Sequence, residues 1–406
     1  MVEKSTLRIM VLDDEPFMLK LMGRLLANLG FTQVTSCDSG RAALAWLDGP
    51  NKPPDLILLD LYMPEMDGLE FVRHLVERHD SGSLILVSGE DERMLQAAVK
   101  LVQAHKISVL GHLRKPVKPA SLSALLEKLT PSSPARPSAA KKVYGADELR
   151  AAIDNGELVN YYQPKVVVAT GEVVGVEALV RWRHPQDGMV FPDQFIGVAE
   201  AHGLIDDLTR VVLTGALAQA RVWQDAGLAL RVAVNVSMVN LASLDFPDFV
   251  AGLAAKAGVP QQGVVLELTE SHLMQDLRTP LETLTRLRLK RFRLSIDDFG
   301  TGHSSLAQLR DMPFDELKID QSFVHRAWAD ETLRAMYDAS LGLARQLGME
   351  AVAEGVEDLN DWDLLRSTGC DLAQGYFIAR PMPAADLPGW MEAWQERVRS
   401  GFAAND

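Results

Sequence analysis

In the C-terminal two thirds of the sequence, short apolar runs end in or contain polar residues where a purely structural barrel would carry valine or leucine. Five of these residues are carboxylates, and the others are two amides and a lysine. The set is Glu177, Asn235, Glu267, Asp297, Asp298, Lys318, Glu354 and Gln374. Buried carboxylates this close together cannot all stay ionised without cations. Oxygen ligands without cysteine or histidine favour two Mg²⁺ or Mn²⁺ ions, a pair suited to cleaving a phosphodiester.

A second acidic set lies near the N-terminus. Asp13 and Asp14 follow one apolar run, and Asp60 ends another. Ligands of open parallel sheets bind at the carboxyl ends of the strands, so these three carboxylates should converge on a site for one Mg²⁺. Ser88 ends a later run, and Lys115 follows the next one. A lysine beside such a cluster can neutralise an incoming phosphoryl group.

The N-terminal set requires a parallel sheet with helices on both faces. Apolar runs rich in Ile, Leu and Val alternate there with segments of 3.6-residue periodicity such as Phe17–Leu29 and Leu69–Val76, which predicts a flavodoxin-like doubly wound fold. The expected strands are Arg8–Leu12, Thr32–Ser36 at a sheet edge, Leu56–Leu59, Leu84–Val87 and Ser108–Leu110.

The C-terminal set requires a larger α/β architecture. About eight strands in some 250 residues have the size and rhythm of a (β/α)₈, TIM-like barrel. Helical patterns lie between the strands, for example at Asp207–Ala226, Phe249–Ala257 and Glu331–Leu347. The expected strands are Val159–Val168, Val173–Ala178, Arg231–Val236, Val264–Leu268, Arg293–Ile296, Glu316–Ile319, Glu350–Ala353 and Leu372–Gly375.

A segment rich in Pro, Ser and Ala separates the two parts. Three prolines and no large apolar residue in 130–140 predict a semi-extended linker. We therefore place a first domain at 1–130, a linker at 131–145 and a barrel at 146–400.

The acid excess is confined to the second domain. The net charge is −14 overall, about −2 in 1–130 and −15 in 146–406, which argues against a DNA-binding protein. No stretch reaches the roughly 18 uncharged apolar residues of a membrane span, and we expect no signal peptide. The two cysteines, Cys37 and Cys370, form no disulfide framework and fit a cytoplasmic protein.

With Asp13, Asp14, Asp60, Ser88 and Lys115 in this order, residues 8–129 resemble a response-regulator receiver domain. The resemblance implies that a sensor histidine kinase phosphorylates Asp60, that the three aspartates and the backbone carbonyl of Tyr62 bind Mg²⁺, and that Ser88 and Lys115 contact the phosphate. It also implies a cis Lys115–Pro116 bond. His112 stands where the family usually has an aromatic switch residue.

The sequence Glu177-Ala178-Leu179 and the later motifs, taken together, resemble the EAL family of cyclic di-GMP phosphodiesterases. The resemblance implies that one ion is held by Glu177, Asn235, Glu267 and Asp297. The other would be held by Asp297, Asp298 and Glu354. Lys318 would orient or deprotonate the attacking water, with Glu354 as the other candidate base, and Gln374 would lie in the shell of metal-bound water.

Further residues match the family's substrate contacts and its mobile loop. Arg181 and the backbone of Leu179 would contact the substrate phosphate, and Gln163 and Glu357 would lie near the nucleotide. Glu270 would anchor the loop 298–306, which couples metal binding to dimerisation in the family. His303 replaces the usual aromatic residue of that loop, and a surface histidine without a role is the favoured interpretation.

These resemblances predict a response regulator that hydrolyses cyclic di-GMP to 5′-pGpG by a two-metal mechanism under control of Asp60. The alternative is a catalytically silent effector that binds cyclic di-GMP. We expect a homodimer or higher homo-oligomer, a histidine kinase as partner, and neither DNA nor a membrane as a partner. Because the substrate is an anion and the domain is acidic, hydrolysis should depend strictly on divalent cations.

Overall fold

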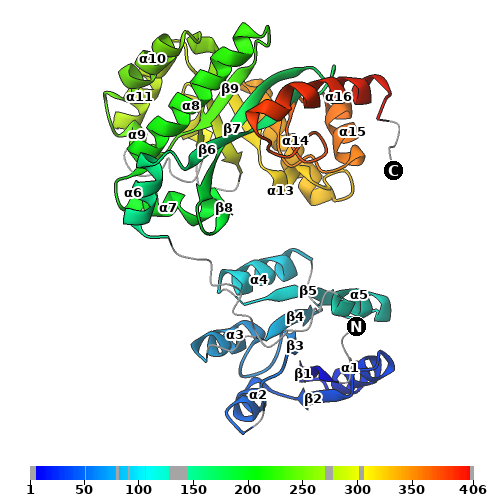
Figure 1. Cartoon of the computed structure of the whole chain (residues 1–406). Coiled ribbons are helices and arrows are strands. Elements are labelled where there is room, and N and C mark those ends of the chain that lie inside the picture. Colours follow the sequence, from blue (N-terminus) through cyan, green and yellow to red (C-terminus); the bar gives the residue numbers. More distant parts are fainter. Residues whose placement is uncertain are drawn as a thin grey trace. The chain divides into compact units, whose positions relative to one another are not determined.

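In the computed structural model, five apolar runs near the N-terminus form one parallel sheet with the strand order β2-β1-β3-β4-β5 (Figure 1). The receiver-type fold expected from the sequence is confirmed, and β2 lies at an edge as predicted. The strands are β1 (Arg8–Leu12), β2 (Gln33–Cys37), β3 (Leu56–Asp60), β4 (Ser83–Ser88) and β5 (Val109–Arg114).

Helices cover both faces of this sheet, because successive residues of a buried strand point to opposite sides. Leu12 and Leu59 belong to one hydrophobic cluster, whereas Val11 and Leu58 belong to the cluster on the other face. The helices are α1 (Pro16–Asn28), α2 (Gly40–Leu47), α3 (Gly68–Glu77), α4 (Glu92–Ala104) and α5 (Pro119–Glu127).

The chain divides into two compact units, Met1–Ala139 and Ala140–Asp406. Within these two units, the structure describes residues 6–50, 52–78, 82–89, 92–105, 107–127, 144–269, 278–300 and 306–402. Most of the predicted linker lies outside these residues, so the predicted domain boundaries stay a prediction.

Eight strands of the second unit close into a barrel, because β6 pairs with both β7 and β14. A short strand, β8, extends the sheet beside β7. The strands are β6 (Leu158–Val167), β7 (Val173–His184), β8 (Gly188–Val190), β9 (Arg231–Asn235), β10 (Val264–Thr269), β11 (Arg293–Phe299), β12 (Glu316–Ile319), β13 (Glu350–Ala353) and β14 (Leu372–Ala373).

The TIM-like barrel is confirmed, with one difference from an all-parallel arrangement. Strand β6 is antiparallel to both of its neighbours. Only a few residues join β6 to β7, with Gly171 at a φ of 73° in the turn. Such a short connection can form a hairpin but cannot hold the crossover that a parallel pair needs. The first strand therefore enters the barrel in the opposite direction.

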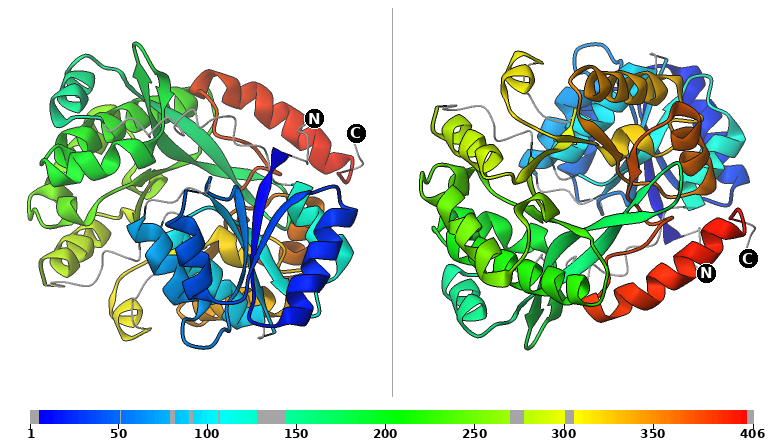
Figure 2. Two further views of the ribbon diagram at one scale, coloured as in Figure 1. Left: turned by 90° about the horizontal axis from the view of Figure 1, so that it is seen from below. Right: turned by 90° about the horizontal axis from the view of Figure 1, so that it is seen from above.

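Helices surround this barrel and bury one continuous hydrophobic core. The last helix, α16, runs beside the β6–β7 hairpin in both views of Figure 2. Trp394 in α16 donates a hydrogen bond of 2.8 Å from Nε1 to the carbonyl of Gly171 in that hairpin. The helices are α6 (Ala146–Asp154), α7 (Ile196–Ala201), α8 (Ile205–Asp225), α9 (Met238–Leu241), α10 (Phe246–Ala257), α11 (Arg278–Leu289), α12 (Leu306–Asp311), α13 (Gln321–Val324), α14 (Glu331–Gln346), α15 (Leu359–Thr368) and α16 (Leu387–Arg399).

Among the described residues, we find no helix with the length and apolar character to cross a membrane.

Candidate active site

The barrel brings the predicted carboxylates together in two overlapping groups. One group consists of Glu177, Glu267 and Asp297, and the other of Asp297, Asp298 and Glu354. Within each group one oxygen per residue lies within 4.8 Å of the others. Asp297 belongs to both groups. This is the arrangement that a pair of divalent ions with one shared ligand would need, and carboxylate oxygens are the donors that Mg²⁺ and Mn²⁺ prefer.

Lys318 lies at the centre of these carboxylates. Its side chain is 1% exposed. The Nζ atom lies 3.4 Å from Glu177, 3.2 Å from Glu267, 3.0 Å from Asp297 and 2.7 Å from Glu354. The four neighbours outweigh the effect of burial, which alone would lower the pKa of Lys318, and they hold that pKa well above its usual value. Lys318 therefore carries a proton in this arrangement.

The predicted amide residues also lie in the site. Asn235 donates from Nδ2 to Glu177 Oε1 at 2.7 Å, and Gln374 donates from Nε2 to Glu177 Oε2 at 2.6 Å. Gln374 also reaches Gln163 Oε1 at 3.0 Å. Oε1 of Gln374 is buried and has no partner among the described residues. Because a buried acceptor without a partner is costly, this oxygen is suited to a bound water or ligand.

The buried carboxylates differ in the direction in which their pKa values are shifted. Burial raises the pKa of Glu267 to about 8, helped by the charge of Glu177, and raises that of Glu354 well above the usual value. Burial and the neighbouring Asp297 raise the pKa of Asp298 to about 6. For Glu177, Lys318 and Lys165 overcome the effect of burial and lower the pKa to about 2. If all five carboxylates were ionised, they would carry more negative charge than Lys318 and Lys165 balance, so the protonated form of some of them is favoured.

An irregularity in β11 allows two consecutive residues to join the same group. Successive side chains of a strand normally point to opposite faces. The pairing of β11 with β12 shifts register between Ile296 and Phe299. Asp298 lies within this shift and has a φ of 54°, which is uncommon outside glycine. Asp297 and Asp298 consequently both approach Glu354.

A pocket of about 220 Å³ lies beside the carboxylates and contains three of the four predicted substrate contacts. Gly355 follows Glu354 in its wall with a φ of 66°, and a Cβ there would collide with Gln321. The lining residues are Gln163, Glu177, Leu179, Gln321, Glu354, Gly355, Glu357, Gln374, Gly375 and Tyr376.

Arg181, the fourth predicted contact, is a buried cation without an acidic partner in the described part of the chain. Its guanidinium lies 5.1 Å from the ring centre of Phe191 and 5.9 Å from that of Tyr161. Nη1 donates to the carbonyl of Val180 at 2.9 Å. Stacking on aromatic rings fixes the guanidinium plane while leaving N–H donors free, which suits an anionic oxygen of a substrate.

A second, more apolar cavity of about 310 Å³ shares Leu179 with the first pocket. Its volume and largely aliphatic lining suit an apolar part of a small ligand. It is lined by Ala178, Leu179, Val180, Pro192, Ile196, Glu200, Ile205, Leu208, Thr209, Val212, Asn235, Val236, Ser237, Met238 and Thr269.

The sequence interpretation missed two charged residues inside the barrel, Lys165 and Glu316. Lys165 Nζ donates to Glu267 Oε1 at 2.6 Å and to Glu316 Oε1 at 2.8 Å. The available signal was the alternation of Glu316 and Lys318 in one short strand, since residues two apart share a face. A residue two positions away from an inward-facing lysine on the same strand must also face inward.

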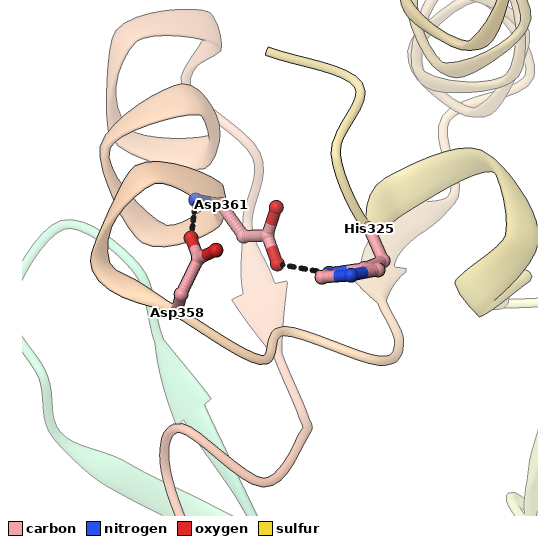
Figure 3. A group of neighbouring side chains, drawn as sticks. All are labelled: His325, Asp358 and Asp361. Atoms are coloured by element: carbon pink, nitrogen blue, oxygen red, sulfur yellow. Dashed lines mark hydrogen bonds and ion pairs between the residues drawn. The ribbon is translucent and has the colours of Figure 1, made fainter. Parts of the chain in front are cut away.

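It also missed a buried carboxylate that joins two loops beside the pocket. Asp361 is fully buried and accepts hydrogen bonds from Arg326 N at 2.9 Å and Glu357 N at 3.1 Å. Figure 3 shows its carboxylate directed at His325, whose Nδ1 lies 2.9 Å away. Asp358 caps the same helix through Asp361 N. Both oxygens of Asp361 are therefore used to hold the loops that follow β12 and β13.

Two predicted residues, Glu270 and His303, lie outside the described residues, as does most of the loop 298–306. Their expected roles stay predictions.

The receiver set converges as well. Asp13, Asp14 and Asp60 place one oxygen each within 4.8 Å of one another. Lys115 Nζ lies 2.9 Å from Asp13 and 2.7 Å from Asp60. Burial raises the pKa of Asp60, although the hydrogen bond from Lys115 opposes this. The backbone N–H of Tyr62 donates to Asp60 at 3.2 Å. These oxygens fit a hard cation such as Mg²⁺.

The remaining receiver residues lie at the adjoining strand ends. Ser88 is fully buried at the end of β4, and its carbonyl accepts a hydrogen bond from Lys115 N at 2.8 Å. The Lys115–Pro116 bond is cis, as predicted. His112 lies half-buried in β5.

Comparison with known families gives two matches. Residues 146–381 match the EAL domain, and residues 9–127 match the response regulator receiver domain. Together the two matches cover both sites described above.

Individual relatives share one or both parts. The chain is 34% identical over 382 residues to cyclic di-GMP phosphodiesterase RocR of Pseudomonas aeruginosa, covering 93% of this chain and 97% of that protein. It is 43% identical over 250 residues to cyclic di-GMP phosphodiesterase NbdA of the same organism, covering 61% of this chain and 32% of that protein. Among solved structures, the PaMucR phosphodiesterase in complex with c-di-GMP is 40% identical, with a TM-score of 0.57, and covers 59% of this chain and 98% of that one.

Proposed function

Since the chain belongs to the EAL domain family and carries a response regulator receiver domain, we propose that it is a response regulator whose barrel hydrolyses cyclic di-GMP to 5′-pGpG. The relative that matches over nearly the whole length of both proteins is named a cyclic di-GMP phosphodiesterase, which supports this proposal. The observation that carries it is the pair of carboxylate groups sharing Asp297, next to Lys318 and the pocket.

Two divalent ions, Mg²⁺ or Mn²⁺, would be held by this donor set. Glu177, Asn235, Glu267 and Asp297 would hold one ion, and Asp297, Asp298 and Glu354 the other. When bound, such a pair activates water and stabilises the negative charge that develops on the phosphoryl oxygens. It also reverses the negative potential of the site, so that an anionic substrate can enter.

The protein's own residues position the substrate and the water. Arg181 and the backbone of Leu179 would contact a phosphate oxygen, and Gln163 and Glu357 would lie near the nucleotide. Gln374 would hold a water through Oε1, which has no partner among the described residues. Because Lys318 carries a proton, it would orient the attacking water, and Glu354, 2.7 Å from Lys318 Nζ, would accept the proton of that water; Lys318 could act as the base only after losing its own proton. As the water oxygen bonds to phosphorus, the P–O3′ bond would break and the released 3′ oxygen would take up a proton.

Regulation would come from the N-terminal unit. A sensor histidine kinase would phosphorylate Asp60, with Asp13 and Asp14 holding Mg²⁺ and Lys115 and Ser88 contacting the phosphoryl group. The convergence of these side chains supports this role. We further propose that the working form is a homodimer or higher homo-oligomer.

The full-length protein should convert cyclic di-GMP to 5′-pGpG in the presence of Mg²⁺, as followed by chromatography at two protein concentrations. Glu177→Ala should abolish cleavage, because it removes a metal ligand. Binding of cyclic di-GMP without any 5′-pGpG would contradict hydrolysis and favour a silent effector. A specific activity that is the same at both concentrations would argue against a dependence on oligomerisation.

A further inference from the structure

A buried ion pair lies beside the candidate metal site and takes no part in the mechanism proposed above. Lys165 in β6 and Glu316 in β12 are 4% and 1% exposed, and Lys165 Nζ lies 2.8 Å from Glu316 Oε1. Removing two charges from water is costly, and a buried pair is often no more stabilising than apolar residues of similar volume. Stability alone therefore does not account for this pair.

The contacts of Glu267 point to a different role. Its Oε1 accepts a hydrogen bond from Lys165 at 2.6 Å, and its Oε2 accepts one from Lys318 at 3.2 Å. Glu267 also belongs to the carboxylate group with Glu177 and Asp297. One oxygen of Glu267 is thus tied to Lys165, and the other contacts Lys318, which lies among the carboxylates of the site.

Lys165 is itself fixed by residues of two other strands. Glu316 accepts from Lys165 and, at 2.9 Å, from Ser295 Oγ in β11. Ser295 pairs in register with Glu316 on one side and with Glu267 on the other. The chain of contacts therefore runs from β11 through β12 to β6 and ends at Glu267 in β10. Because these strands are joined in one barrel, Lys165 has little freedom to move.

We infer that Lys165, held by Glu316, is a positioning residue that fixes the carboxylate of Glu267 so that a single oxygen serves the cation site shared with Glu177 and Asp297. This inference rests on the proposed metal-dependent function. Partners of this kind orient metal ligands, and their loss commonly weakens metal binding ten- to hundredfold.

The test is a calorimetric titration of the full-length protein with Mn²⁺ in the absence of substrate. In the double variant Lys165→Met/Glu316→Leu, both charges are replaced by apolar side chains, so that neither is left unpaired. We expect one Mn²⁺ to bind about ten- to a hundredfold more weakly. In turnover assays we expect kcat to fall at fixed Mn²⁺ with little change in KM, and added Mn²⁺ should restore part of the loss.

Lys290→Met is the matched control. It removes another lysine of the same unit, and its partner Asp248 keeps an ion pair of 2.6 Å with Arg286. Mn²⁺ affinity should stay at the wild-type value in this variant. If the apolar double variant does not fold, Lys165→Gln/Glu316→Gln keeps polar side chains at both positions and should still bind one Mn²⁺ at least about threefold more weakly.

Wild-type Mn²⁺ affinity in a folded double variant would overturn the positioning role, and so would an equal loss in Lys290→Met. The two proposals fail in different ways. Intact Mn²⁺ binding by a wild-type protein that cannot cleave cyclic di-GMP contradicts the phosphodiesterase activity alone. Normal cleavage together with unaltered Mn²⁺ binding in the double variant contradicts the positioning role alone.

Discussion

At the residue scale, the site depends on how one lysine is shared among carboxylates. Lys318 contacts members of both groups that we assign to cations. An ion held in either group would therefore share oxygens with Lys318. A protonated ammonium would then lie next to the proposed position of the phosphoryl group and the attacking water.

Replacing Lys318 should separate its catalytic effect from its effect on stability. Lys318→Met should lower turnover by about a hundredfold or more, because the only lysine in contact with Glu354 among the described residues is lost. In EDTA, the free energy of unfolding should fall by about 3–5 kcal/mol, because buried carboxylates lose their counter-charge. Thermal melts in EDTA and in Mg²⁺ measure the second effect.

Lys318→Arg is the control, since it keeps the charge. It should recover most of the stability in EDTA but not the turnover. Full turnover by Lys318→Met would contradict our assignment of Lys318 to the reaction.

The environment of Arg181 predicts an effect on substrate binding. Arg181→Lys should raise KM by about tenfold or more with a smaller change in kcat, because lysine lacks the planar donors and stacks poorly on Phe191. Steady-state kinetics with cyclic di-GMP measure this. Arg183→Lys, an exposed position on the same strand, should leave KM unchanged. A similar KM for both variants would contradict our assignment of Arg181 to the substrate site.

At the scale of elements, the site is built from the ends of strands and from loops that are tied to one another. The irregular stretch of β11 delivers two aspartates instead of one. The loops after β12 and β13 are joined by Asp361, which contacts the backbone of both. Asp361 lies in helix α15 and holds Glu357 through its backbone N–H. The position of Glu357 in the pocket wall therefore depends on Asp361.

Asp361→Ala should therefore affect both folding and substrate binding. Two backbone N–H groups and His325 lose their buried acceptor, so the free energy of unfolding should fall by about 2–4 kcal/mol. KM should rise several-fold, because Glu357 is no longer held. Denaturant unfolding and kinetics measure the two effects.

Asp358→Ala is the matched control, because the side chain of Asp358 caps α15 through Asp361 N and, within the described part of the chain, accepts no hydrogen bond from Glu357 N or Arg326 N. It should cost about 1 kcal/mol and leave KM unchanged. If Asp361→Ala loses stability but keeps its KM, the link between Asp361 and Glu357 is not functional.

At the scale of the whole molecule, two acidic sites lie in two compact units of one chain. The N-terminal site is suited to accept a phosphoryl group, and the C-terminal one to cleave a phosphodiester. Regulation of one by the other requires that phosphorylation change the equilibrium between two states of the chain.

Phosphorylation should therefore change the turnover of the full-length protein. Treatment with a small phosphoryl donor and Mg²⁺ should alter the rate of 5′-pGpG formation in the wild type but not in Asp60→Ala, which has no acceptor carboxylate. Equal rates for the wild type with and without donor, despite phosphorylation shown by mass spectrometry, would contradict regulation through Asp60.

Removal of divalent ions should stop hydrolysis completely. In EDTA we expect no 5′-pGpG, and Mg²⁺ or Mn²⁺ should restore it, because the pocket of this acidic domain admits an anion only when cations reverse its potential. Measurable turnover after exhaustive dialysis against EDTA would contradict the two-metal proposal. The Asp60→Ala variant should show the same dependence, since its barrel site is unchanged.

The sequence by itself determined the two fold classes, since the alternation of apolar runs and helical periodicity depends only on local pattern. It also identified the carboxylates, because acidic residues at the ends of apolar strands have few structural explanations. The tertiary structure decided which distant strands and side chains come into contact, because a local sequence pattern holds no information about them. Three features depend on how distant strands come together when the barrel closes. They are the antiparallel pairing of β6 with β14, the shift in β11 that brings Asp298 beside Asp297, and the contacts of Lys165 with Glu316 and Glu267. Side-chain contacts between residues that are 102 or 151 positions apart leave no trace in local periodicity.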